Sequence, residues 1–468
     1  MRSLPLVAAL LAASAHTLPA QSVSRATEPI TRRTAQVTFD SAWNRIRATH
    51  YDTAMNGVDW NVVRDTLLPR ASRARTLGEL RATITAMLST LRESHFVLIP
   101  QEAADAIDPD RSRAAVGDAP GDVGIALRLI GDTVVVSHVR PGSSAARAGV
   151  QAGWIVDSVG RFSAARSRAA MRGGAVTRRQ LVAMIPGSAA AQFVGAAGTP
   201  VHAVFTDATG RTSVKRLVRD PMPGMPVRFG NLPTMFVEVA HRELPLAGRP
   251  GCAGVIRLTA WMLPATAQLD SAVDAVRHCD GIVVDIRGNP GGIGAMVMAF
   301  GGHFLDTTAA LGVITTRGRT LRFVANPRRA NTRNEPVRPY AGPLAIVVDS
   351  LSMSTSEIFA AGMQATGRAR IVGENTPGLA LPAVLTRLPT GDVLMHVFAD
   401  FTDPTGRRIE GRGVVPDVLV PLTRRDLLAG RDAPLDAAVT WITGAGAAAT
   451  AGQAAAGSGA PARAGAAP

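Results

Sequence analysis

"VVDSLSMSTSEIFAAGM", residues 347–363, joins an apolar run to a helix-like pattern through a cluster of hydroxyl side chains. Four serines and one threonine lie between positions 350 and 356. Ser354 and Glu357 fit the S-x-x-E capping box, which satisfies free N–H groups at a helix start. The same position suits a nucleophilic serine, because backbone N–H groups there can stabilise an oxyanion. The stretch predicts a strand-to-helix junction and leaves capping and catalysis both open.

The composition indicates a folded chain with no nucleic-acid partner. The 468 residues suffice for two or three domains, and the 46% apolar share predicts a substantial core. The net charge of +14 comes from scattered arginines, and aromatic residues make up only 4%. A nucleic-acid surface would need a basic stripe, usually with stacking aromatics. Lys215 is the single lysine, which limits any mechanism that requires a lysine base.

The first 20 residues have the features of a secretory signal peptide. One early positive charge precedes a short apolar stretch, and small residues allow cleavage after Ala15 or Ala20. No segment offers the ~20 uninterrupted apolar residues of a membrane-spanning helix. We therefore expect an exported, periplasmic or secreted protein without stable membrane insertion.

The two cysteines are predicted to form a disulfide. Cys252 and Cys279 would lie in an oxidising compartment after export. Each stands just before an apolar run, "GVIRL" and "GIVVDI". If these runs become neighbouring parallel strands, the two thiols begin side by side.

The remaining pattern divides the chain into further segments. Apolar residues at three- and four-residue spacings predict helices before the strand-like "SHFVLIP". Later, short apolar runs such as "GIVVDIRG" and "PLAIVVDS" are typical of strands buried on both faces, and they alternate with helical patterns, as in an α/β core. The expected segments are a helical N-terminal region (36–100), a β-rich module (115–220), an α/β core (221–443) and a disordered Ala/Gly-rich tail (444–468).

The β-rich module resembles a PDZ domain. "GIAL" is similar to the carboxylate-binding loop of that family, and "RPGSSAARAGVQAGWIVDSVG" is similar to the segment that follows it. The resemblance implies that polypeptide C-termini bind at the backbone of Gly124, Ile125, Ala126 and Leu127.

Two motifs in the core resemble the protease family of the C-terminal processing peptidases and the tricorn core protease. "RGNPGG" is similar to the R-x-N-x-G-G motif, through Arg287, Asn289, Gly291 and Gly292. "SMSTSE" is similar to S-x-S-x-S-E, with Ser352, Ser354, Ser356 and Glu357. The resemblance implies an α/β fold with a crotonase-like (ββα) catalytic core, a helical N-terminal region and an inserted PDZ-like domain. It also implies that Ser354 is the nucleophile.

An oxyanion hole is expected beside Ser354. The N–H of the next residue, Thr355, would point near the serine oxygen at a strand-to-helix junction. The turn at Gly291 and Gly292 would let a second amide approach without a side-chain clash. Each such donor typically contributes ~2.7–4 kcal/mol to transition-state stabilisation.

The serine needs a base, and the sequence excludes lysine. In the processing-peptidase branch the base is a lysine in G-E-x-T-x-G-K, but here "GENTPGL" has Leu379 at that position. The tricorn-like branch uses histidine. The resemblance implies His95 as base, Ser94 as the residue that orients it, and Glu410 as the support of Ser94. An ordinary histidine would give an acidic limb near pH ~6.5.

No metal or cofactor motif is present. The cysteines lack C-x-x-C spacing, no H-E-x-x-H occurs, and no phosphate-binding glycine loop follows a strand. The sequence thus predicts an exported serine endopeptidase that acts on unstructured polypeptides without a cofactor. An inactive polypeptide-binding protein on the same fold, and an esterase or amidase, remain alternatives. Nothing in the sequence indicates the oligomeric state.

Overall fold

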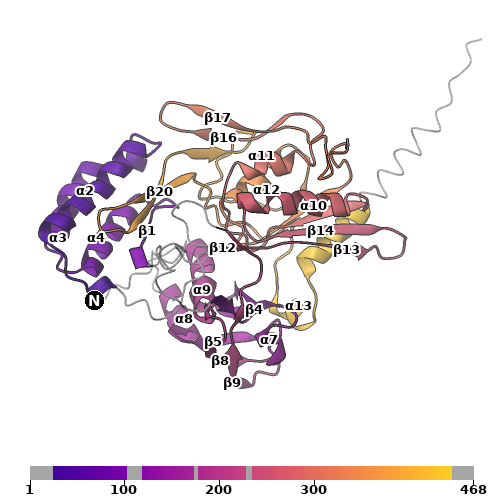
Figure 1. Ribbon diagram of the computed structural model, residues 1–468, viewed down its shortest axis with the longest axis horizontal. Helices are drawn as coiled ribbons and strands as arrows, with labels where there is room; N and C mark the ends of the chain where they lie inside the picture. Colours follow the sequence, from indigo (N-terminus) through magenta and orange to yellow (C-terminus); the bar gives the residue numbers. More distant parts are fainter. Residues whose placement is uncertain (1–24, 103–118, 173–177, 228–234, 445–468) are drawn as a thin grey trace, which may run out of the picture.

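A computed structural model describes residues 25–102, 119–172, 178–227 and 235–444. The predicted signal peptide and the tail from residue 445 lie outside the described residues. Figure 1 shows three parts: N-terminal helices in indigo, a module in purple and magenta, and a core in pink to yellow. Within the described residues, no helix has both the length and the apolar character needed to cross a membrane.

The N-terminal region is helical, as predicted. Its helices are α2 (Arg32–Thr49), α3 (Trp60–Ser72) and α4 (Leu77–Ser89), with short 3₁₀ turns η1 (Arg25–Thr27) and η2 (Met55–Gly57). Thr31, Asp59 and Thr76 cap the three helices, since each side chain accepts an N–H of the first turn. Their apolar faces meet in one buried cluster that includes Phe39 and Ile84.

A small sheet ties this region to the C-terminal half of the chain. Strand β1 (Val97–Ile99) pairs antiparallel with β21 (Val393–Val397), which also pairs with β20 (Ala383–Arg387). Leu98 and Leu394 belong to the buried cluster of the N-terminal helices. The pairing fixes the residues just before β1, including Ser94 and His95, beside the C-terminal half.

The inserted module has its own core and two sheets. Its main sheet has the order β3–β4–β5–β8–β9, with β6 added to β5. The strands are β3 (Ile125–Ile130), β4 (Thr133–Val139), β5 (Ile155–Val159), β6 (Phe162–Ser163), β8 (Pro200–Thr206) and β9 (Thr212–Val218). A smaller sheet contains β2 (Pro120–Asp122), β7 (Gly195–Ala196) and β10 (Asp220–Pro221), and the helices are α7 (Ser144–Arg147), α8 (Ala164–Arg172) and α9 (Arg178–Phe193). Val136, Val156 and Phe205 lie in the module's buried cluster.

The core is built on a six-stranded sheet that is parallel except at one edge. Its order is β13 (Val239–Pro245), β14 (Cys252–Leu258), β15 (Gly281–Asp285), β18 (Leu344–Val348), β19 (Arg370–Gly373) and β23 (Val418–Leu419). Only β13 is antiparallel to its neighbour. All residues of β15 and β18 are buried, as expected for parallel strands covered on both faces.

Helices cover both faces of this sheet. On one face, Ile282 and Val284 pack in a cluster with α10 (Thr266–Val276), α11 (Met296–Gly301) and α12 (Thr355–Ala365). On the other, Val283 packs with the helix over residues 433–444. The alternation of neighbouring residues between the two clusters follows from the two-residue period of a strand.

The remaining elements flank the core. A sheet of order β17 (Thr320–Ala325), β16 (Ala309–Thr315) and β22 (Asp400–Thr402) packs against α12. The others are η3 (Leu263–Ala265), β11 (Met225–Val227), β12 (Met235–Val237) and α13 (Arg424–Leu428). Cys252 and Cys279 form the predicted disulfide, because β14 and β15 are parallel neighbours.

Candidate active site

Ser354 stands at the junction of β18 and α12 in an unusual backbone conformation. Its φ of 55° and ψ of −117° are rare for a residue other than glycine. Such conformations persist only where the surroundings impose them, and they cluster at functional sites. The predicted capping box is present, with the Ser354 N–H donating to the Glu357 carboxylate at 3.2 Å. A capping hydroxyl acts as an acceptor, so its proton stays available and capping does not exclude catalysis.

The other two serines of the motif have structural roles. The buried Ser352 hydroxyl donates to the Ile286 carbonyl at 2.9 Å. The Ser356 hydroxyl donates to the Asn289 carbonyl at 3.1 Å and accepts the Trp261 indole N–H at 2.9 Å. These three bonds tie the loop to the segments that follow β14 and β15. Of the three serines, only Ser354 keeps accessible surface.

The glycine turn lies directly against Ser354. A Cβ at Gly291, whose φ is 101°, would come within 2.7 Å of the Ser354 Cβ and 3.0 Å of the Thr355 nitrogen. A Cβ at Gly292, whose φ is 139°, would be 2.1 Å from the Trp261 carbonyl oxygen. Only glycine permits both conformations and this close approach.

The three predicted oxyanion-hole residues differ in what their amides do. The Gly291 N–H already donates to the Asn289 side-chain oxygen at 2.9 Å. The amides of Gly292 and Thr355 have no acceptor among the described residues. The Thr355 hydroxyl donates to the Gly292 carbonyl at 2.9 Å and holds the two together. Gly291 therefore supplies space, and Gly292 and Thr355 supply the free donors.

Ser94, His95 and Glu410 form a hydrogen-bonded chain. The Ser94 Oγ lies 2.7 Å from His95 Nδ1 and 2.9 Å from a Glu410 carboxylate oxygen. The Ser94 N–H donates to the other Glu410 oxygen at 3.0 Å. His95 has a φ of 61°, a second non-glycine residue with a left-handed backbone. Residues separated by more than 300 positions thus meet in one group.

The number of available protons fixes which atom donates in each of these hydrogen bonds. An ionised carboxylate only accepts hydrogen bonds, so the single Ser94 hydroxyl proton goes to Glu410. The Ser94 oxygen then accepts from His95 Nδ1–H. This assignment leaves His95 Nε2 unprotonated, which is the form required of a general base.

Burial shifts the pKa values of three groups here. His95 is half-buried as a residue, and the burial of its side chain lowers its pKa to about 4. Burial raises the pKa of Glu410, against the hydrogen bonds from Ala380 and Ser94. Burial also raises the pKa of Glu357 to about 7, although Thr376 and two backbone amides donate to it. The pKa of His95 is therefore lower than the ordinary value of ~6.5 that the sequence led us to expect.

Residues 378–380 link the serine loop to the histidine group. The Leu379 carbonyl accepts the Ser354 N–H at 2.9 Å, and the Leu379 N–H donates to Glu357 at 2.8 Å. The next amide, that of Ala380, donates to Glu410 at 2.9 Å. No hydrogen bond joins His95 to Ser354 directly. Catalytic hydrogen bonds are often long in free enzymes and shorten when substrate binds.

Comparison with known proteins identifies the family. Residues 253–420 match the family model of peptidase family S41, and residues 31–89 match that of the tricorn protease C1 domain. Residues 253–420 thus form a domain of peptidase family S41. The chain is a serine-type peptidase, a hydrolase.

The relatives of this S41 peptidase include both branches named above. It is 25% identical to the chloroplastic C-terminal processing peptidase of Tetradesmus obliquus, over 86% of this chain and 78% of the relative. Identity to the carboxyl-terminal-processing protease of Synechocystis is also 25%, over 86% of each chain. It is 27% identical to tricorn protease homolog 1 of Streptomyces coelicolor, over 86% of this chain and 34% of the relative.

Solved structures show the same fold. The photosystem II D1 C-terminal processing protease has a TM-score of 0.55 at 22% identity, over 86% of this chain and 98% of that chain. Mature CPAF complexed with lactacystin also has a TM-score of 0.55, at 11% identity, over 85% of this chain and 95% of that chain. The mixed α/β architecture with a helical N-terminal region is thus that of S41 folds.

An acidic residue in the nucleophile loop was not anticipated from the sequence of this S41 peptidase. Asp349 accepts the amides of Gly288 and Leu351 at 2.9 Å each. It also accepts Nε–H of Arg128, from β3 of the inserted module, at 2.7 Å. The only sequence signal was the position of Asp349 at a strand end, and nothing indicated Arg128.

The predicted peptide-binding residues lie at one edge of the module's sheet. Gly124 has a φ of 79°, and its carbonyl accepts the Arg140 N–H. Ile125, Ala126 and Leu127 begin β3, which among the described strands pairs only with β4. Helix α9 packs against the same strand. An edge strand beside a helix is the geometry used in strand addition of a peptide.

Proposed function

We propose that this S41 peptidase is an exported endopeptidase that hydrolyses peptide bonds of unstructured polypeptides. Ser354 is the nucleophile, His95 the general base, and Ser94 with Glu410 position the base. The observation that carries this proposal is the Ser94 bridge, at 2.7 Å to His95 and 2.9 Å to Glu410. A histidine placed only by packing would have no need of a buried carboxylate behind it.

The proposed reaction gives each of these groups one role. Ser354 Oγ attacks the scissile carbonyl, and His95 Nε2 takes the serine proton. The oxyanion of the tetrahedral intermediate accepts from the Gly292 and Thr355 amides. The imidazolium then returns the proton to the leaving amine, and water releases the acyl group by the same route. Ser94 and Glu410 stabilise the imidazolium through the Nδ1 side.

Further parts of the proposal concern the fold and the location. The parallel sheet with helices on both faces is consistent with a crotonase-like core. The free edge of β3 beside α9 supports a PDZ-like module that binds polypeptide C-termini. The charged and apolar pattern of residues 1–20 supports export, and so does the disulfide.

Labelling with a fluorophosphonate tests the nucleophile. We expect the mature chain to react once, and Ser354→Ala to abolish labelling. Ser350→Ala is the matched control, because Ser350 lies in the same loop outside the assigned site. An unlabelled wild-type protein would favour the inactive binding protein. Labelling with turnover of small esters but of no unfolded protein would favour the esterase.

A further inference from the structure

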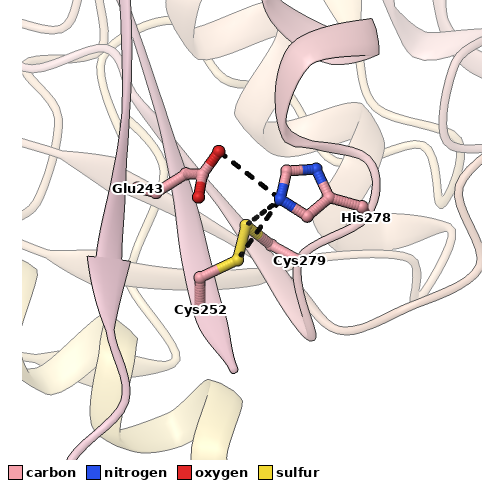
Figure 2. A group of neighbouring side chains, drawn as sticks. All are labelled: Glu243, Cys252, His278 and Cys279. Atoms are coloured by element: carbon pink, nitrogen blue, oxygen red, sulfur yellow. Dashed lines mark hydrogen bonds and ion pairs between the residues drawn. A yellow bond between two sulfur atoms is a disulfide. The ribbon is translucent and has the colours of Figure 1, made fainter. Parts of the chain in front are cut away.

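Four potential metal ligands converge at the end of the core sheet opposite the nucleophile. Figure 2 shows Glu243 on β13, Cys252 at the start of β14, and His278 with Cys279 just before β15. His278 Nε2 lies 3.4 Å from a Glu243 oxygen, and 3.8 Å and 4.0 Å from the two sulfurs. All four donor atoms lie within 4.8 Å of one another.

This donor set suits a tetrahedral cation once the disulfide is reduced. Zinc binds thiolate sulfur at ~2.3 Å, and imidazole nitrogen or carboxylate oxygen at ~2.0–2.2 Å. Such bonds place neighbouring donors roughly 3.3–3.8 Å apart, close to the separations around His278 Nε2. Disulfide sulfurs are poor ligands, whereas thiolates are among the strongest. The oxidised pair and the metal-bound pair therefore exclude each other.

We propose that reduction of the Cys252–Cys279 disulfide creates a site for a zinc-like divalent cation, with Glu243, Cys252, His278 and Cys279 as ligands. A dithiol reductant supplies two electrons and two protons by thiol–disulfide exchange and becomes a disulfide itself. The cation then displaces the two thiol protons to solvent. The site is separate from the catalytic group, because it lies at the amino ends of β14 and β15.

The backbone holds the two cysteines in place without the sulfur–sulfur bond. The Asp280 carboxylate accepts the Cys252 N–H at 3.1 Å, and the Asp280 N–H donates to the Cys252 carbonyl at 2.9 Å. The Tyr340 hydroxyl donates to the Cys279 carbonyl at 2.9 Å. These bonds survive reduction, so the thiols remain neighbours and no large rearrangement precedes binding.

The site also has an open side. The side chains of Glu243 and His278 are 51% and 59% exposed, and Cys252 is partly buried. Cys279 is 4% exposed and forms the floor. A reductant and a hydrated cation both approach from the side of Glu243 and His278.

Cobalt titration of the full chain tests the proposal. The protein is reduced with a phosphine, freed of excess reductant under anaerobic conditions, and titrated with Co²⁺. We expect one Co²⁺ per chain, with sulfur-to-cobalt charge-transfer and tetrahedral d–d bands that Zn²⁺ abolishes. The oxidised protein should show neither band. His278→Ala and Glu243→Gln should weaken binding by at least the ~10–100-fold typical of losing a hydrogen-bond partner of a metal ligand.

His241→Ala is the matched control, since His241 is exposed on the same strand as Glu243. It should bind Co²⁺ as the wild type does. The proposal is overturned if reduced and oxidised wild-type protein bind Co²⁺ equally, with circular dichroism showing both folded. It is also overturned if thiolate bands appear but His278→Ala and Glu243→Gln leave their intensity and the affinity unchanged.

Discussion

Two residues of the proposed site have a backbone conformation that residues other than glycine rarely adopt. His95 and Ser354 have φ values of 61° and 55°, in the left-handed region. Each conformation is held by bonds to distant segments, at Ser354 through Leu379 and at His95 through its neighbour Ser94 and Glu410. Strain of this kind costs roughly 1–3 kcal/mol per residue, which the surrounding contacts must offset.

The lowered pKa of His95 predicts the pH dependence of the reaction. The base must be neutral, and with a pKa of about 4 it is neutral at all higher pH values. The value of kcat/KM should therefore hold as the pH falls through 6.5, and drop only as the pH approaches 4. The measurement is kcat/KM on a peptide between pH 4 and 8. An acidic limb at or above pH 6.5 would contradict the buried base.

The same assignment predicts the effect of removing the imidazole. His95→Ala should lower kcat by ~10²–10⁴-fold, the usual contribution of a general base. His241→Ala, on the exposed face of β13, should leave kcat unchanged. Near-full activity in His95→Ala would refute the assignment.

At the scale of elements, an ion pair joins the inserted module to the nucleophile loop. Arg128 on β3 and Asp349 after β18 are both largely buried, with 14% and 7% of their side chains exposed. Asp349 also holds the glycine turn through the Gly288 amide. A movement of β3 would thus act on both segments that form the proposed oxyanion hole.

Arg128→Met should lower kcat/KM by roughly 2- to 30-fold, as expected for a coupling of 0.5–2 kcal/mol. The matched control is Arg147→Met, whose guanidinium pairs with Asp220 inside the module at 2.6 Å. Both variants remove one ion pair of the module, but only Arg128 reaches the core. Peptide hydrolysis and thermal unfolding are measured for each. Equal losses of activity in the two variants would show that the bridge has no special effect.

At the scale of the whole molecule, the module lies between the N-terminal helices and the core in the chain. Its described residues begin at 119 and its last strand ends at Pro221, so both ends lead back to the parts that hold His95 and Ser354. If β3 binds a C-terminus, the rest of the polypeptide stays attached to the protein that cleaves it. Docking should then lower KM for substrates with a free carboxylate.

Peptides with free, apolar C-termini should show KM values roughly tenfold below those of their amidated forms, a difference of ~1.4 kcal/mol. Ala126→Glu should abolish the preference, because a carboxylate in β3 repels the terminal one. Val214→Glu is the control, since Val214 is 66% exposed on β9 at the opposite edge of the same sheet. Equal KM values for free and amidated peptides, across several sequences, would remove the docking role.

The sequence by itself predicted those features that depend only on residues close together in the chain. The apolar runs at 281–285 and 344–348 predicted buried strands, and Ser354 with Glu357 predicted a helix start. Leu379 occupies the position of the lysine base in the processing-peptidase branch, so the sequence excluded a lysine base there. These features depend on periodicity, capping and residue identity, which neighbouring residues fix.

Tertiary structure alone decided how distant residues meet. The pairing of β1 with β21 places Ser94 and His95 beside the C-terminal half of the chain, where Ser94 donates a hydrogen bond to Glu410. The pairing of β13 with β14 and of β14 with β15 brings the four side chains of the proposed metal site together without any motif spacing. The pKa of His95 falls because the folded chain excludes water around it. Burial and long-range pairing are properties of the packed chain, so no local pattern could have given them.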